Sequence, residues 1–384
     1  MKIKSRPEDF VVDEVSSFVP DPLGRYFVYE LAKRSLSTFE ALGLVAKRAG
    51  MHRRDLSPSG LKDKHGLTRQ LFSSPRALPG DIGDDRVSLK LVGKCDTVLT
   101  PGFIVGNRFE ITLRNLRQCE LDVLPRNIDE MKQFGIPNYY DNQRFGGIAH
   151  GQGFIGRALA LGNFEEALRL HLAAPHRKQS LKDKTNRRLG AKHWGDWKTL
   201  HGKMRSSPER ALVEYLIGHP DDFAGCFERI TPFLRNMFIA AYQSYLFNET
   251  LRRMVLKFAP TAVVVRNKAG EIAFYRTLPD NAFAGLELPL PGPGTRLDEF
   301  PQSASFLHEV LKQEGLTLSC LSLSGLERTG FKSSTRSALM LPEGFECGDV
   351  TPDDLNEGTS KIVVKFQLGR GSFATIVTRR LVLE

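Results

Sequence analysis

The two ends of this chain carry a strand pattern that its middle lacks. Four N-terminal segments alternate apolar and polar side chains with period two, which is typical of half-buried strands. They span residues 10–14, 26–31, 87–92 and 103–113. Near the other end, residues 361–368 and 373–383 are rich in Val, Ile, Thr and Phe and predict two more strands. Because the pattern between about residues 151 and 325 favours helices, we expect a strand-rich parent domain interrupted by an inserted, mainly helical one.

The helix signals are local. Ser37 and Glu40 have the spacing of a capping box, and the helix that they open should end near Gly50. A second helix is expected over residues 121–134, closed by Gly135. In the middle of the chain, the apolar spacing predicts further helices over residues 155–172, 209–217 and 233–258.

Charge and length restrict the classes of partner and of fold. The chain has 54 Lys and Arg against 44 Asp and Glu, a net charge of +10, which favours a polyanion such as nucleic acid. Its 384 residues suggest two or three domains. The five cysteines are odd in number and widely spaced, which favours reduced thiols. No apolar run is long enough for a membrane span, so we expect a soluble, cytoplasmic protein.

The first candidate for chemistry is Asp63, which lies between Lys62 and Lys64 just before a predicted strand. Neighbouring cations keep a carboxylate ionised even when burial opposes the charge, which suits a nucleophile or a base. Gly, Lys and Asp are also common in solvated turns, so the residues alone leave both interpretations open.

The surrounding segment resembles the signature of the TruD family of pseudouridine synthases. In that signature, Gly-x-Lys-Asp is followed by Thr and Gln five and seven residues beyond the Asp, and Gly60, Lys62, Asp63, Thr68 and Gln70 match it. Other segments match in the same order along nearly the whole chain. They are residues 6–14 (Arg-Pro-Glu-Asp-Phe-Val-Val-Asp-Glu), 137–146 (Pro-Asn-Tyr-Tyr-Asp-Asn-Gln-Arg-Phe-Gly), 331–340 more weakly, and 371–375 (Gly-Ser-Phe-Ala-Thr).

The resemblance implies an α+β fold. Its catalytic core would be a mixed, mainly antiparallel sheet with flanking helices, split by a mainly helical α+β insertion. We therefore expect the first part of the core over residues 1–150, the insertion over residues 151–325, and the second part of the core over residues 326–384.

The resemblance also implies the reaction and the substrate. A pseudouridine synthase is an isomerase that breaks the N-glycosidic bond of uridine, rotates the base and joins C5 to the ribose, so no cofactor and no metal are expected. The substrate would be tRNA, at uridine 13 in the D-arm, and other structured RNAs are not excluded. We expect a monomer without a membrane partner.

Individual roles carry over from the matching motifs. Asp63 would be the catalytic carboxylate, either attacking the sugar or removing a ribose proton, and both roles require it to be ionised. Lys4 would be its ion-pair partner, although Lys62 could supply the charge instead. Other residues are expected to contact the uridine. They are Phe10 and Phe373 as pocket walls, Lys62 as a substrate contact and Asn138 as a reader of the pyrimidine edge.

One position departs from the family pattern. Tyr140 stands where the family motif has Phe, so its ring keeps a stacking face and gains a hydroxyl. That hydroxyl could take part in proton transfer at C5, or it could simply have a water or backbone partner.

A basic segment within the predicted insertion is a candidate RNA contact. Residues 176–205 contain ten Lys or Arg against two Asp, together with both tryptophans of the chain. Exposed cations and aromatic rings could contact phosphates and unstacked bases, whereas the alternative is a solvated loop. The candidates are Arg177, Lys178, Arg187, Arg188, Lys192, Trp194 and Trp197.

Two functions of other classes remain open. One is an RNA-binding or RNA-folding protein of the same fold without activity, against which the intact Lys62, Asp63 and Asn138 argue. The other is a metal-dependent RNA hydrolase, for which the scattered histidines, including His65, offer no clear ligand cluster.

Overall fold

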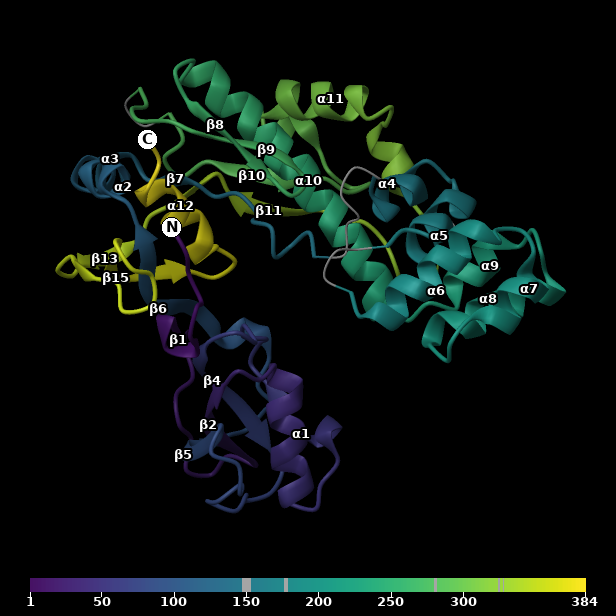
Figure 1. The fold of residues 1–384 in the computed structure, drawn as a ribbon, viewed down its shortest axis with the longest axis horizontal. Coiled ribbons are helices and arrows are strands. Elements are labelled where there is room, and N and C mark those ends of the chain that lie inside the picture. Colours follow the sequence, from purple (N-terminus) through teal and green to yellow (C-terminus); the bar gives the residue numbers. More distant parts are fainter. Residues whose placement is uncertain (147–152, 176–178, 280–281, 324, 327) are drawn as a thin grey trace. The chain divides into compact units, whose positions relative to one another are not determined.

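The computed structural model describes residues 1–146, 153–175, 179–279, 282–323, 325–326 and 328–384. The chain folds as two compact units (Figure 1): residues 1–136 with 340–384 form unit 1, and residues 137–339 form unit 2. The chain passes between the units within the paired strands β7 (Ile136–Pro137) and β12 (Leu339–Met340). A compact unit and an inserted domain need not share limits, so the predicted domain limits at 151 and 325 stay a prediction.

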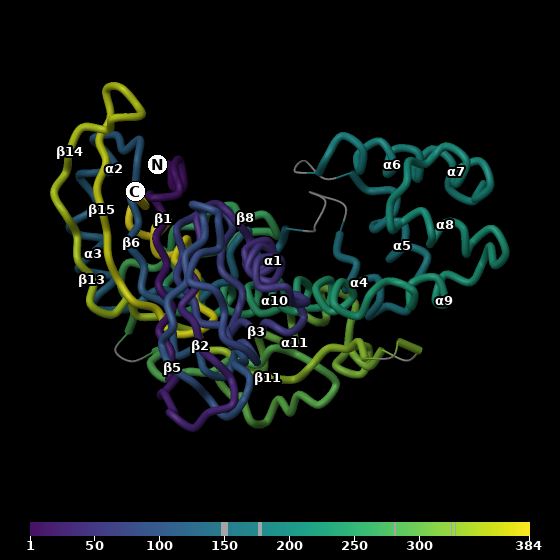
Figure 2. The backbone as a smooth tube through the Cα atoms, turned by 90° about the horizontal axis from the view of Figure 1, so that it is seen from below, coloured from purple at the N-terminus to yellow at the C-terminus, as the bar shows by residue number. Residues whose placement is uncertain are grey.

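Unit 1 is built on a mixed, mainly antiparallel sheet, as expected. The strand order is β13-β15-β6-β1-β4-β2-β5, with β14 paired to β15 and β3 to β4. β1 pairs with β4 in parallel, whereas it pairs with β6 antiparallel. The chain folds back from β14 to β15 as a hairpin (Figure 2). The strands are β1 (Phe10–Ser16), β2 (Tyr26–Arg34), β3 (Ser57–Pro58), β4 (Leu67–Ser74), β5 (Val87–Cys95), β6 (Ile104–Leu116), β13 (Glu343–Cys347), β14 (Thr351–Pro352) and β15 (Ser360–Gly369).

The helices of unit 1 pack on this sheet and on each other. Ser37 caps α1 as predicted: its Oγ accepts from the Glu40 amide at 3.2 Å, and the Glu40 carboxylate accepts from the Ser37 amide at 2.7 Å. Leu42 and Val45 of α1 form a buried cluster with Leu31 of β2. The helices and turns are α1 (Thr38–Arg48), α2 (Gln118–Asp122), α3 (Leu124–Phe134), α12 (Ala374–Leu381), and the 3-10 turns η1 (Pro7–Asp9), η2 (Arg53–Asp55) and η3 (Pro101–Phe103).

Three sequence-based predictions of single elements need correction. Residues 373–383 contain helix α12 and not a strand, because the buried Ala374, Val377, Thr378 and Leu381 recur with helical spacing. The helix predicted over residues 121–134 is two helices, α2 and α3. The helix predicted over residues 155–172 is also two, α4 and α5.

Unit 2 is mainly helical and is organised around the long helix α10. α4 packs on α10, and α5 packs on α4, α6 and α9 (Figure 1). Its helices and turns are α4 (Ile155–Ala160), α5 (Phe164–Leu172), α6 (Leu181–Lys192), α7 (Trp197–Lys203), α8 (Pro208–Gly218), α9 (Phe223–Glu228), α10 (Pro232–Phe258), α11 (Ala304–Gln313), η4 (Leu297–Glu299) and η5 (Leu318–Leu321). Its strands form the pairs β8 (Val263–Asn267) with β9 (Gly270–Phe274) and β10 (Glu287–Leu290) with β11 (Ser334–Ser337).

Among the described residues, no helix combines the length and the apolar character that crossing a membrane requires.

Candidate active site

The parallel pairing of β1 with β4 brings two distant parts of the chain together. Val11 of β1 lies opposite Leu67 of β4, so the segments that lead into the two strands lie at the same end of the sheet. Lys4 lies in the first of these segments and Asp63 in the second. The Lys4 ammonium forms an ion pair and a hydrogen bond with Asp63 Oδ2, and the two side chains are only 19% and 13% exposed. Lys4 is therefore the ion-pair partner of Asp63.

The surroundings of Asp63 favour the ionised carboxylate. Its Oδ1 accepts from the His65 amide at 3.0 Å. The Lys4 Nζ atom also lies 3.9 Å from the centre of the buried Phe10 ring. Burial opposes ionisation of Asp63, but the charge and hydrogen bond of Lys4, with the His65 amide, outweigh it, so the pKa of Asp63 lies below its ordinary value. A carboxylate that stays charged while mostly shielded from water suits a nucleophile or a base.

Lys33 is a site residue that sequence reasoning missed. Its side chain is 1% exposed, and its Nζ donates to the backbone carbonyls of Leu36 and Asp63, each at 2.7 Å. Desolvation lowers the pKa of Lys33 to about 8, although the nearby Asp63 charge acts in the opposite direction. A signal was present: Lys33 follows Tyr29 and Leu31 in the buried alternation of β2.

The spacing of the signature residues has a structural basis in this loop. Gln70 Nε2 donates to the Gly60 carbonyl at 2.7 Å, and Gln70 Oε1 accepts from Thr38 Oγ1 at 2.8 Å. The same Thr38 oxygen accepts from the Lys62 amide at 3.0 Å. Because Thr38 and Gln70 are buried, these bonds fix the backbone on the N-terminal side of Asp63.

Gly66 closes the other side of the loop. A Cβ atom at this position would lie 2.4 Å from the Phe10 carbonyl oxygen, which is closer than any side chain can approach. The glycine therefore allows the loop backbone to lie directly against the start of β1.

The structure directs Lys62 away from Asp63. Its Nζ lies 2.8 Å from Glu14 Oε2 and donates to Asn107 Oδ1 at 2.6 Å. The Lys62 and Glu14 side chains are 6% and 1% exposed, so the expected substrate contact of Lys62 conflicts with its burial. Sequence alternation alone could not decide between the two lysines, because the loop bends between residues 60 and 66.

Phe373 lies half-buried at the residue before α12, after the end of β15. Its predicted position in a base pocket stays a prediction.

Asn138 and Tyr140 belong to unit 2, where they form a buried cluster with Arg336. Arg336 donates from Nε to the Asn138 carbonyl at 2.9 Å and from Nη2 to Asn138 Oδ1 at 2.6 Å. Asn138 Nδ2 in turn donates to the Ser337 carbonyl at 3.1 Å. The Arg336 guanidinium lies 4.1 Å from the centre of the Tyr140 ring, which meets Phe247 edge to face. Burial lowers the pKa of Arg336. Sequence reasoning missed Arg336 as well.

The basic segment is only partly the surface that we predicted. Arg188 and Lys192 are exposed on α6. Arg187 is half-buried and donates to the carbonyls of Leu170 and Ala174, at 3.3 and 3.0 Å, so its guanidinium is already used inside the unit. Arg177 and Lys178 lie outside the described residues.

The two tryptophans do not form an exposed aromatic face. Trp197 is 5% exposed and belongs to the core of unit 2. Its ring meets the Trp194 ring edge to face, with 5.0 Å between the ring centres. Trp194 is half-buried and donates to Glu165 Oε1 at 3.0 Å. Helix packing has buried the Trp197 ring, which conflicts with the predicted contact to bases, so that contact stays a prediction.

All five cysteines are free thiols. In the described part of the chain, no three His, Cys, Asp or Glu side chains gather as a metal-binding group.

Comparisons with known proteins show the family and the fold to which this chain is similar. The family model of tRNA pseudouridine synthase D (TruD) matches residues 1–381. The Methanocaldococcus jannaschii protein named "Probable tRNA pseudouridine synthase D 2" is 32% identical, covering 100% of this chain and 92% of that protein. The tRNA pseudouridine synthase D of Aquifex aeolicus is 29% identical, covering 99% of this chain and 98% of the relative. A crystal structure of a TruD protein from Methanosarcina mazei superposes with a TM-score of 0.72 at 27% identity, covering 99% and 93% of the two chains.

Proposed function

Because the chain belongs to the tRNA pseudouridine synthase D family, we propose that it isomerises uridine to pseudouridine in tRNA, at uridine 13 of the D-arm. The observation that carries the proposal is the Asp63 carboxylate, which is mostly buried and paired with Lys4, whose ammonium also lies over the Phe10 ring. A family resemblance supplies the reaction, and this geometry supplies a group able to perform it.

The reaction is an isomerisation, so its atoms balance within the nucleotide and water. The bond from N1 of the base to C1′ of the ribose breaks, a bond from C5 to C1′ forms, the C5 proton leaves and N1 gains a proton. Asp63 starts the reaction by attacking the sugar or by removing a ribose proton. Either step needs the ionised carboxylate, which Lys4 stabilises, and the burial of the pair limits attack by water on the open intermediate.

Lys33 and the loop contacts act through Asp63. The Lys33 ammonium binds the Asp63 carbonyl, while Gln70 and Thr38 fix the preceding residues, so the carboxylate has little freedom to move from its position. Restricting a reacting group in this way removes an entropic cost from the reaction step.

Asn138, Tyr140 and Phe373 keep the roles that the resemblance implies, as part of the proposal. Within the described part of the chain, the bonds of the Asn138 amide to Ser337 and Arg336 leave one N–H and one acceptor lone pair, which is enough for a pyrimidine edge. The Tyr140 ring, which lies under the Arg336 guanidinium, would wall the base pocket, and its hydroxyl would be the proton-transfer group. Phe373 would be a wall of the base pocket.

For the RNA contact we retain the exposed Arg188 and Lys192 of α6 and propose that they bind phosphates. We also propose that the protein acts as a monomer in the cytoplasm, without a cofactor or a metal.

The test is tritium release from tRNA labelled at C5 of uridine. The wild-type protein should release tritium with and without EDTA, and Asp63→Asn should lower the rate by at least about 100-fold, the effect typical of a general acid or base. Asp13→Asn is a matched control, since Asp13 is also paired with a cation, Arg69, but is 35% exposed, and it should stay active.

Other outcomes of the same assay would contradict the proposal. Binding of tRNA without tritium release would indicate an RNA-binding protein, and cleavage of the strand would indicate a hydrolase. Modification at another uridine, located by mass spectrometry, would reject position 13 while leaving the reaction intact.

A further inference from the structure

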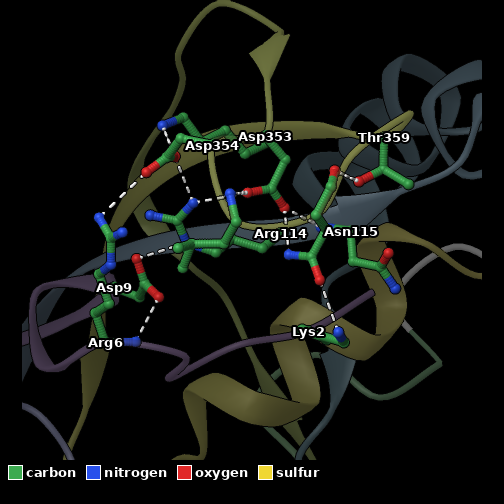
Figure 3. Close-up of polar contacts among 11 residues, drawn as sticks. Lys2, Arg6, Asp9, Arg114, Asn115, Asp353, Asp354 and Thr359 are labelled. Carbon is green, nitrogen blue, oxygen red and sulfur yellow. Dashed lines mark hydrogen bonds and ion pairs between the residues drawn. The ribbon is translucent and has the colours of Figure 1, made fainter.

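A charged cluster with a buried centre lies beside the N-terminal segment that carries Lys4 (Figure 3). At its centre is Arg114 of β6, whose side chain is 6% exposed. Arg114 Nε donates to Asp9 Oδ1 at 2.8 Å, and its Nη1 donates to Asp353 Oδ1 at 2.8 Å and to Asp354 Oδ1 at 2.7 Å. We call Asp9, Arg114, Asp353 and Asp354 the Arg114 cluster.

The cluster anchors the chain after Lys4. Asp9 Oδ2 accepts from the Arg6 amide at 2.8 Å, so the carboxylate that pairs with Arg114 also fixes the backbone of residue 6 (Figure 3). Arg6 Nη1 adds a second contact, to Asp354 Oδ2 at 3.1 Å.

The cluster also anchors the chain before Lys4. The Lys2 amide donates to the Arg114 carbonyl at 2.7 Å, and the Arg114 amide donates to the Lys2 carbonyl at 2.8 Å. Asp353 Oδ2 accepts from Asn356 Nδ2 at 2.8 Å, and Asn356 Oδ1 accepts from the Lys2 ammonium at 2.7 Å. Residues 2 and 6 are therefore both tied to Arg114 or its partners, and Lys4 lies midway between them.

Lys4 itself has an unfavourable backbone conformation. Its φ is +61°, in the left-handed region that a lysine rarely adopts because its Cβ crowds the backbone. Such a conformation persists only where the surrounding structure fixes it, and it is found most often at functional sites. The two anchors flank this residue directly, and its side chain is the one that reaches Asp63.

We propose that Asp9 and Arg114 are positioning residues for the isomerisation, which act by holding Lys4 in its left-handed conformation with its ammonium on Asp63. The proposal rests on the proposed function, because it assumes that Asp63 is the catalytic carboxylate. A purely structural cluster would support the stability of the sheet without influencing the ionisation of Asp63.

The pH dependence separates these two roles. The titratable groups facing Asp63 are Lys4 from the N-terminal segment, Lys33 from β2 and His65 from its own loop. If Lys4 loses its alignment, burial of Asp63 is less well opposed and the pKa of Asp63 rises. The acid limb of the kcat/KM profile then moves to higher pH, because a larger fraction of the carboxylate is protonated at a given pH.

Asp353 and Arg114 of the cluster keep their charges in the range of this experiment. Burial alone would raise the pKa of Asp353, but the amides of Leu355 and Asn115, with Asn356 and Arg114, lower it to about 2. Burial likewise opposes the charge of Arg114, yet its carboxylate partners outweigh burial and raise its pKa. A shift of the acid limb in this range is therefore not a titration of Asp353 or Arg114.

The experiment compares tritium release from C5-labelled tRNA by Asp9→Asn and by the wild type between about pH 3.5 and 7, because the acid limb set by Asp63 lies in the acidic range. The variant keeps the shape of the side chain but replaces an acceptor with a donor that faces Arg114 or the Arg6 amide. We expect the acid limb to move up by about one pH unit, which is about a tenfold loss of kcat/KM on that limb, with recovery at high pH. Hydrogen exchange of residues 2–6 should become faster.

Two further variants separate a positioning role from a general loss of stability. Asn356→Ala removes the contact to Lys2 at the exposed edge of the cluster, should not impair folding, and should give a smaller shift in the same direction. Glu130→Gln is the matched control: it breaks the ion pair of Glu130 with the buried Arg380, between α3 and α12 of the same unit, and should lower stability without moving the acid limb.

An acid limb that stays in place in Asp9→Asn and Asn356→Ala, while residues 2–6 exchange faster, would overturn the positioning role. An equal shift of the acid limb in Glu130→Gln would also overturn the positioning role, because any loss of stability in unit 1 would then be enough to move the limb. A wild type that releases no tritium would instead refute the proposed function, which is a distinguishable result.

Discussion

Replacing Glu14 with Gln tests whether Lys62 is part of the framework of unit 1 or a contact to RNA. The Lys62 Nζ and Glu14 Oε2 atoms are 2.8 Å apart, and the side chains are 6% and 1% exposed. At that separation, the attraction is about 6 kcal/mol for an effective dielectric constant of about 20, before the cost of desolvating both charges. Gln keeps the shape of Glu14 and leaves the Lys62 ammonium buried without its counter-charge.

The expected cost is about 3–5 kcal/mol in the free energy of unfolding, because breaking one partner of a buried pair leaves the other charge unpaired. Lys62→Met should cost a similar amount. The double variant Glu14→Gln/Lys62→Met should cost much less than the sum, since no buried charge remains, and a coupling of at least about 2 kcal/mol should result.

The assay must read unit 1 specifically. Both tryptophans, Trp194 and Trp197, lie in unit 2, so their fluorescence follows that unit and should be unaffected. Hydrogen exchange of peptides from β1 and β4, measured by mass spectrometry, reports the opening free energy of the sheet that holds Glu14. Tritium release by the folded double variant then measures function separately.

Two results would refute this reasoning. A cost below about 1 kcal/mol for each single change, with additive effects, would mean that the pair is effectively solvated. A double variant that is stable but whose KM for tRNA rises tenfold or more would mean that the Lys62 ammonium contacts the substrate, as the sequence led us to expect.

The other predictions concern the loop around Asp63. The pKa of Lys33 is lowered to about 8 from 10.5, so between these values the unfolded state binds more protons and the stability contributed by this group rises with pH. Urea unfolding should show the wild type gaining roughly 3 kcal/mol over Lys33→Met from pH 7 to 11, and a constant difference would contradict the shifted pKa. Gly66→Ala should cost about 1–3 kcal/mol and lower kcat, because its Cβ would meet the Phe10 carbonyl at 2.4 Å. Its control, Gly43→Ala in α1, meets nothing within 4 Å and should be neutral or stabilising by up to about 1 kcal/mol; equal losses would refute the argument from close approach.

Elements set by neighbouring residues were predictable from the sequence. The cap of α1 depends on Ser37 and Glu40 alone, and the structure has both of its hydrogen bonds. The broken helices also had local signals that we overlooked. Pro125 stands in the first turn of α3, where proline favours a helix start, and Gly162, with φ of +71°, lies between α4 and α5.

The end of the chain shows why composition misleads. Val, Ile and Thr have a preference for strands, but in α12 the helical spacing of the buried residues prevails, and a tertiary contact stabilises the helix. Asn127 of α3 donates to the carbonyls of Leu381 and Leu383, at 2.9 and 2.8 Å, and so satisfies groups at the C-terminal end of α12. No pattern within residues 373–383 reveals a partner about 250 residues away.

Of the two lysines near Asp63, Lys33 could be predicted from the strand pattern of the sequence and Lys4 could not. Lys33 continues the buried alternation of Tyr29 and Leu31, and this pattern predicts that its ammonium is buried. The pattern does not predict the hydrogen bond from Lys33 to the Asp63 carbonyl. Lys4 carries no such sign. Its contact with Asp63 follows from the parallel pairing of β1 with β4, and the choice of a parallel neighbour depends on the whole sheet and not on the residues that flank the strand. A family resemblance can supply that pairing, whereas the residue pattern alone leaves two lysines equally eligible.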